Sequence, residues 1–104
     1  MDNLPEASLT ISLDKAITTL NGRESWESIT LHEPNFSEVE AFYKEARASS
    51  EFTAMACLIA TVSGINLMAI KALPIRKFRD AQGYMLDFLN YFPDKESGKI
   101  PLPT

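Results

Sequence analysis

The stretch LIATVSGINLMAI, residues 58–70, predicts two helices that meet at a glycine. Its first half is apolar with almost no polar face, as in a helix enclosed by neighbours on most sides. Gly64 can adopt the left-handed conformation that ends a helix. Ala60, Gly64, Ile65 and Ile70 also have the spacing A-x-x-x-G-I-x-x-x-x-I, which many helix-turn-helix DNA readers share. The stretch therefore predicts a helical corner and raises the question of whether the chain reads DNA.

A DNA-reading role depends on polar residues in the second helix of this corner. That helix is mostly apolar, and only Asn66 and Lys71 could address a base or a phosphate. The chain as a whole carries a formal net charge of -4, which repels phosphate. A small DNA-binding regulator stays an alternative interpretation, and nucleic acid is an unfavoured partner. The residues that would contact DNA are Asn66, Lys71, Arg76, Lys77 and Arg79.

Upstream of the corner, the sequence predicts a β-hairpin over about residues 9–32. Apolar residues of one parity run from Leu9 to Ile17, as a half-buried strand requires. Asn21-Gly22 follows, the dipeptide best able to supply two positive φ angles for a tight turn. The second strand should run from about Glu24 to His32.

The register of this hairpin contains a conflict. A two-residue turn at Asn21-Gly22 places Ile17 opposite Trp26 but turns Ile29 to the other face. A slip of one residue reverses every side chain. We therefore expect either a bulge near residues 27–28 or a three-residue loop that also takes in Arg23.

Helices should follow the hairpin. Asn35 and Ser37 are alternative N-caps of the first helix, each with a glutamate three residues later in a capping-box arrangement. The last helix carries apolar and aromatic residues over an arc of roughly 160°, broader than one contact surface needs. The expected bounds are about 36–48, 51–63, 66–72 and 75–92.

The fold class is α+β, with an N-terminal β-hairpin followed by a compact bundle of three to four helices. A chain of 104 residues fits one domain, here residues 9–92. Residues 1–8 are expected to be a flexible arm and residues 93–104 a flexible C-terminal tail, because both segments are polar and contain proline.

No constellation of catalytic residues is evident. The one histidine, His32, follows a strand, and the one cysteine, Cys57, lies in a segment expected to be buried and therefore unreactive. A single cysteine excludes an internal disulfide and a multi-cysteine metal site. The four glycines are scattered, so no phosphate-binding loop is formed. We expect a protein that is not an enzyme and that holds no metal or cofactor.

The N-terminus and the hydropathy pattern predict a cytoplasmic protein. The first ten residues carry two acids and no basic residue, the wrong charge for a secretory signal. Nowhere do 18 apolar residues run together, so no membrane span is expected. The lone cysteine fits a reducing compartment.

Two groups of residues follow an order found in a known family. The first group is Ile11, Leu13, Lys15, Ile17, Gly22, Ile29, Leu31 and Pro34. The second group is Val62-Ser63-Gly64-Ile65, Leu73, Ile75 and Phe78. Over about residues 9–92 this order resembles the small tail assembly chaperones of contractile-tailed, Mu-like bacteriophages and prophages. Two departures are His32, where the family often has arginine, and residues 76–79, which are more basic than the family's segment.

The resemblance implies a function that composition does not give. Such proteins are thought to bind the long, helical tape measure protein in the bacterial host cytoplasm and to keep it soluble. Tail tube subunits then replace them, and they are absent from the finished virion. On this interpretation the wide apolar arc of the last helix is where a partner or a second copy would bind. The candidate partner-binding residues are Tyr84, Met85, Phe88 and Tyr91; alternatively, these side chains simply complete the core.

The family also suggests a longer form of the protein. Its members are often made in two forms, the longer by ribosomal frameshifting near the end of the short reading frame. Gly98-Lys99 can be encoded by a slippery run of G and A. We therefore hypothesise a frameshifted form as a further partner, and a coding sequence without such a run near the stop codon would remove this hypothesis.

Overall fold

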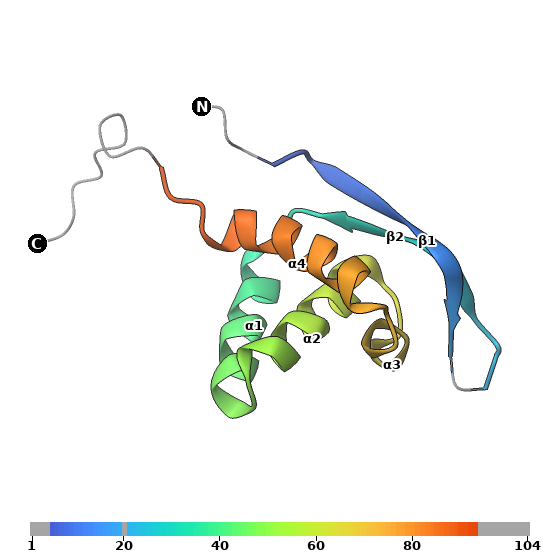
Figure 1. The fold of residues 1–104 in the computed structure, drawn as a ribbon. Helices are drawn as coiled ribbons and strands as arrows, with labels where there is room; N and C mark the ends of the chain where they lie inside the picture. The colour runs from blue at the N-terminus through green and yellow to red at the C-terminus, as the bar shows by residue number, and fades with distance from the viewer. Residues whose placement is uncertain (1–4, 20, 94–104) are drawn as a thin grey trace, which may run out of the picture.

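The computed structural model describes residues 5–19 and 21–93, and within them it confirms the α+β class. Two antiparallel strands form a hairpin that lies along one side of the helices (Figure 1). The strands are β1 (Ser8–Thr18) and β2 (Ser25–His32). The helices are α1 (Phe36–Ala48), α2 (Glu51–Ser63), α3 (Leu67–Lys71) and α4 (Ile75–Leu89).

The register of the hairpin shifts once along its length. Near the turn, Ile17 pairs with Trp26 as predicted, whereas further along Ile11 pairs with Ile29. Between these pairs, residues 13–16 of β1 lie opposite Glu27 alone. The expected irregularity is therefore present beside Glu27, but the extra residues are in β1 and not in β2.

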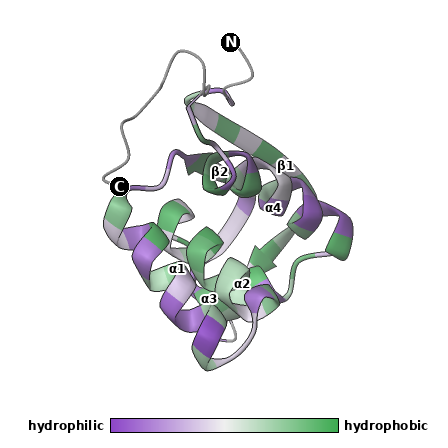
Figure 2. Cartoon of the chain, turned by 90° about the vertical axis from the view of Figure 1, so that its left-hand side faces the viewer, coloured by the Kyte–Doolittle hydropathy of each residue, from purple (hydrophilic) through white to green (hydrophobic). Residues whose placement is uncertain are grey.

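This offset resolves the conflict of side-chain directions. Trp26 and Ile29 lie three positions apart in β2, yet both contact the hydrophobic core. Hydrophobic and more polar residues alternate along the first part of β1, visible as stripes in Figure 2. An interruption of the ladder is the usual way in which a strand redirects its side chains without losing its partner.

The turn of the hairpin differs from the prediction. The Thr19 N–H donates to the Glu24 carbonyl (3.0 Å), which leaves four residues between the closing pair rather than two or three. Among the described residues only glycines have positive φ, and Gly22 has φ 71°. Asn21 keeps a negative φ because its side chain has another role: its Oδ1 accepts the Arg23 N–H (2.9 Å). Such four-residue connections are commonly built around a type I β-turn.

The helices begin and end close to the predicted positions. Asn35, and not Ser37, caps α1: its Oδ1 accepts the Glu38 N–H (2.8 Å) and its own N–H donates to Glu38 Oε1 (2.9 Å). The bounds of α2 are as predicted. The last helix ends at Leu89, three residues earlier than predicted. Pro93 disfavours helical backbone at Phe92, the last residue of the predicted helix.

The helical corner predicted from residues 58–70 is present. Gly64 follows α2 with φ 77°, and its N–H donates to the Ala60 carbonyl (2.9 Å). Asn66 then begins α3, because its Oδ1 accepts the N–H groups of Met68 and Ala69. Gly64 therefore ends α2, and Asn66 starts α3 two positions later.

Changing Gly64 to alanine should lower the free energy of unfolding by about 1–2 kcal/mol, because a Cβ is strained in the left-handed region. The matched variant is Gly83→Ala, in the interior of α4, where an added Cβ meets nothing within 4 Å. That variant should stabilise the chain by up to about 1 kcal/mol. Urea unfolding of both variants measures the two changes in stability. Equal changes would contradict the role of Gly64 as the C-cap of α2.

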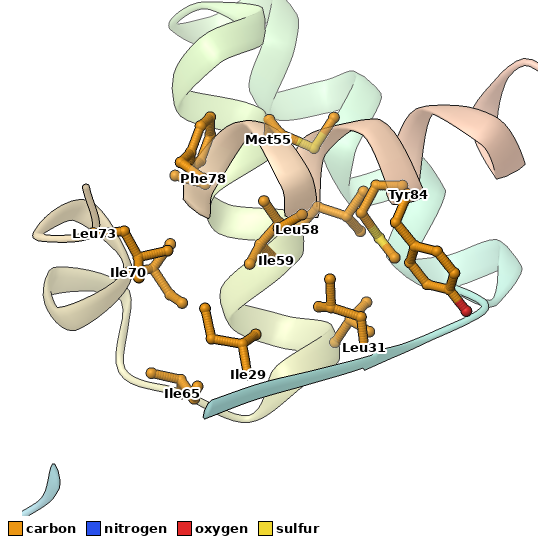
Figure 3. Close-up of a cluster of buried hydrophobic side chains, with 14 of the residues drawn as sticks. Ile29, Leu31, Met55, Leu58, Ile59, Ile65, Ile70, Leu73, Phe78 and Tyr84 are labelled. Carbon is orange, nitrogen blue, oxygen red and sulfur yellow. The ribbon is translucent and has the colours of Figure 1, made fainter. Parts of the chain in front are cut away.

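The core surrounds α2. This helix contacts α1, α3, α4 and β2. In Figure 3, Ile29 and Leu31 of β2 point toward Leu58 and Ile59 of α2. Among the described residues every buried side chain of the core is hydrophobic, with no buried charged group. The remaining helices present their outer faces as candidate binding surfaces.

Candidate partner-binding surfaces

The four residues predicted to bind a partner are placed at different depths. Met85 is 0% exposed and Tyr84 is also buried, so both belong to the chain's own core. Phe88 is half-buried and packs against that core. Tyr91, beyond the end of α4, is 52% exposed. Of this set, only Tyr91 is open to a partner in the isolated chain, and the binding role of the set stays a prediction.

Tyr84 connects the last helix to the start of the first strand. Its hydroxyl donates to the Glu6 carbonyl, and its ring meets Phe88 edge-on with centroids 5.1 Å apart. Burial raises the pKa of the Tyr84 hydroxyl, and the nearby charges of Glu6 and Glu33 raise it further. Glu6 was expected in a flexible arm, yet its carbonyl is held here. Residues 1–4 and 94–104 of the predicted arm and tail lie outside the described residues.

The Tyr84→Phe variant should lose about 0.5–1.5 kcal/mol of stability at pH 7, because one hydrogen bond is removed. A pH effect should accompany it. The folded pKa lies above the ordinary tyrosine value of 10.0, so the stabilisation is complete below pH 10 and is lost as pH rises through the folded pKa. Unfolding measured at pH 7, 9 and 11 checks this. An identical pH dependence in both proteins would contradict the assignment.

Large apolar side chains are exposed at several places. Single exposed apolar residues are ordinary on a protein surface, and only groups of them indicate a binding site. In the described part of the chain they are Phe36, Tyr43, Phe52, Met68, Ile75, Leu86, Tyr91 and Phe92. Phe52 and Ile75 differ from the others because they border one common hollow.

This hollow, the apolar groove, lies between the start of α2, α3 and the start of α4 and has a volume of about 400 Å³. Buried side chains form its floor, namely Ile70, Leu73 and Phe78, of which Figure 3 shows the positions. Phe52 and Ile75 stand at its rim, each 52% exposed. The Phe52 ring is fixed against Phe78, edge-on at 5.1 Å between centroids. The groove is thus a shaped apolar surface with a buried floor.

A second hollow of about 590 Å³, the charged hollow, adjoins the groove. Residues 13–15 of β1 line one side, and the first turns of α4 line the other. Ile75 lines both hollows. The register shift in β1 falls at residues 13–16, so the irregular segment of the hairpin is the one that faces α4 here.

The residues of the DNA-reading alternative have other surroundings. Asn66 uses its side-chain oxygen to begin α3. Lys71 lines the apolar groove, and Arg76, Lys77 and Arg79 line the charged hollow. Arg79 donates to Gln82 (2.7 Å) and lies over the Phe52 ring, 5.6 Å from its centroid. The helix that would read bases has five residues, and nothing in the described chain favours this alternative.

Two single residues noted in the sequence lie outside both hollows. Cys57 is half-buried and not buried as expected. The His32 Nδ1 is 2.9 Å from the Glu33 carbonyl oxygen. Within residues 5–19 and 21–93, no three His, Cys, Asp or Glu side chains are grouped as metal ligands. No helix in those ranges combines the length and the hydropathy that a membrane span needs.

A family model described as "Phage tail assembly chaperone proteins, E, or 41 or 14" matches residues 10–90. No curated protein and no solved structure matches the chain. The matched range runs from β1 to the end of α4 and includes the apolar groove and the charged hollow. A family of tail assembly chaperones implies a tail protein as partner and suggests a non-enzymatic role. With most of its length matched, the chain belongs to the phage tail assembly chaperone family.

Proposed function

We propose that this chaperone binds the tape measure protein of its phage through exposed apolar surface and keeps it soluble while the tail is built. The observation that supports this most is the apolar groove, where Phe52 and Ile75 are exposed above a buried floor. A long helical protein exposes apolar stripes that aggregate. An apolar groove on a folded domain can cover such a stripe, as in other helix-in-groove complexes.

The proposed contact is reversible. It is confined to a single groove of about 400 Å³, and small interfaces are typical of transient complexes. Several copies along one tape measure chain would cover it while each copy stays exchangeable. Tail tube subunits would then displace them. On this account the chaperone acts in the bacterial host cytoplasm and is absent from the finished virion.

Further partners follow from the same account and stay predictions. They are the tail tube protein, a second copy of the chain and a frameshifted longer form. Gly98-Lys99, on which the longer form depends, lies outside the described residues. Mass spectrometry of purified virions tests the departure of the chaperone, which should be absent at a level where each tail protein is detected.

Coexpression with the tape measure protein of the same phage tests the proposal. The supernatant fraction of the tape measure protein should rise when the chaperone is present. The Ile75→Ser, Phe52→Ser double variant changes only half-exposed rim residues, so it should stay folded and protect less. If the tape measure protein stays equally insoluble beside a soluble, folded chaperone, the proposal is wrong.

A further inference from the structure

We infer that the apolar groove and the charged hollow form one docking site for an amphipathic helix whose apolar stripe is flanked by acidic residues. The inference rests on the proposed function and adds the chemistry of the segment that is bound. Ile75 supports treating the two hollows as one site, because its exposed side chain lines both. A helix laid across Ile75 would place apolar side chains in the groove and its flank over the charged hollow.

The charge of this site is opposite to that of the chain. Five of the ten Lys and Arg residues line the two hollows, against two acidic residues, Asp14 and Asp80. The chain as a whole has a formal net charge of -4. A local cationic surface on an acidic protein attracts acidic partners and repels basic ones. The five cations are Lys15, Lys71, Arg76, Lys77 and Arg79.

Two of these cations are placed where helix stability disfavours them. Arg76 and Lys77 lie in the first turn of α4, which contains no acidic residue and has no side-chain cap. The positive end of the helix dipole repels cations in this position. Folding therefore does not account for the two charges, whereas an acidic partner lying over the start of α4 would.

The apolar rim argues for a helix and against a nucleic acid. Phe52 and Ile75 are each half-exposed beside the cations, and Asp80 would face a phosphate backbone. A second copy of this chain is a weaker occupant, because its amphipathic helix α1 mixes the exposed cations Lys44 and Arg47 with three glutamates, so its flanks are not uniformly acidic. A partner helix with acidic flanks would place apolar side chains in the apolar groove and acidic side chains over the charged hollow.

The test uses two synthetic helical peptides of about 20 residues, long enough to hold a helix. Both carry leucine at i, i+3, i+4 and i+7; one has glutamate beside this stripe and the other has lysine. Nuclear magnetic resonance titration of the full chain should show the glutamate peptide shifting signals around Phe52, Ile75 and Phe78. The lysine peptide should bind at least about tenfold more weakly, and added salt should reduce this difference.

Variants locate the site. Ile75→Ser should weaken the glutamate peptide about tenfold. Met68→Ser is the matched control, because Met68 is equally exposed at 52% but lines neither hollow, and it should bind as the wild type does. The double variant Arg76→Glu, Lys77→Glu should favour the lysine peptide. Equal binding of both peptides, or equal loss in the two serine variants, would overturn the inference.

The outcomes separate this inference from the proposed function. If the wild-type chain protects the tape measure protein while neither peptide binds, the docking site is wrong and the function stands. If the glutamate peptide binds as described and the tape measure protein stays insoluble, the function is wrong and the site stands. Sedimentation that reveals a dimer dissociated by Ile75→Ser would overturn the inference in favour of a second copy, and binding of a DNA duplex that the glutamate peptide displaces would overturn it as well.

Discussion

Replacing Met85 with alanine should lower the free energy of unfolding by about 2–5 kcal/mol. Met85 is 0% exposed and is among the largest fully buried side chains of the chain. Its truncation removes contacts on the side of α4 that faces the core and leaves a cavity that its neighbours fill only in part. Urea unfolding followed by circular dichroism measures the loss.

The control for this prediction is Tyr91→Ala, which changes another residue of the predicted binding set. Tyr91 is half-exposed beyond the end of α4, so its removal should change stability by no more than about 0.5 kcal/mol. The pair separates a core residue from a surface residue within one sequence-derived set. A small effect at Met85 together with a large effect at Tyr91 would reverse this assignment.

Ile29→Ala should lower the free energy of unfolding by a similar amount, about 2–5 kcal/mol. Ile29 is 0% exposed and lies in β2, the strand that contacts α2. The neighbouring variant Thr30→Ala should lose much less, no more than about 1 kcal/mol. Thr30 is exposed and loses only a side-chain contact with Thr10, at 3.2 Å between the two hydroxyl oxygens. Thermal and urea unfolding of the two variants measures the difference.

This pair also tests the register of the hairpin. In an antiparallel strand, neighbouring residues point to opposite faces, so a slip of one position would exchange the roles of the two residues. A larger loss at Thr30 than at Ile29 would show that the ladder is shifted from the observed pairing.

Local signals in the sequence were sufficient for the helices. Asn35 and Glu38 form a capping box through contacts three residues apart, and Gly64 ends α2 through its own backbone freedom. Such features depend on few neighbours, so a pattern predicts them well. The wide apolar arc of α4 also has a simple cause: the helix contacts both β1 and α2, and a side chain such as Met85 is buried in the core.

The irregular pairing of the hairpin and its turn were predicted less well than the helices. The conflict between Trp26 and Ile29 indicated an irregular hairpin, but periodicity could not tell which strand holds the extra residues. Asn21-Gly22 suggested a two-residue turn, and the actual closure depends on the Asn21 side chain bonding to its neighbours. The position of the extra residues depends on the partner strand, whereas the turn depends on hydrogen bonds of Asn21 with residues two positions away, which the Asn-Gly dipeptide alone does not show.

The proposed docking site shows the same division. In the sequence, Arg76, Lys77 and Arg79 form a basic cluster that is compatible with DNA, and the apolar residues beside them come from elsewhere in the chain. Phe52 is distant in sequence from Ile75, and only the packing of α2 beside α4 brings them to one rim. A signal was nevertheless present: cations at the start of a helix are unfavourable, and their presence there suggested a role other than folding.

Deletion of this reading frame from its phage or prophage tests the central claim, a chaperone role in tail assembly, most directly. The measurement is the number of complete tails per cell lysate, counted by electron microscopy after induction. We expect heads without complete tails, and recovery of tails when the wild-type chain is supplied from a plasmid. Complete tails of normal length and number after the deletion would contradict the account.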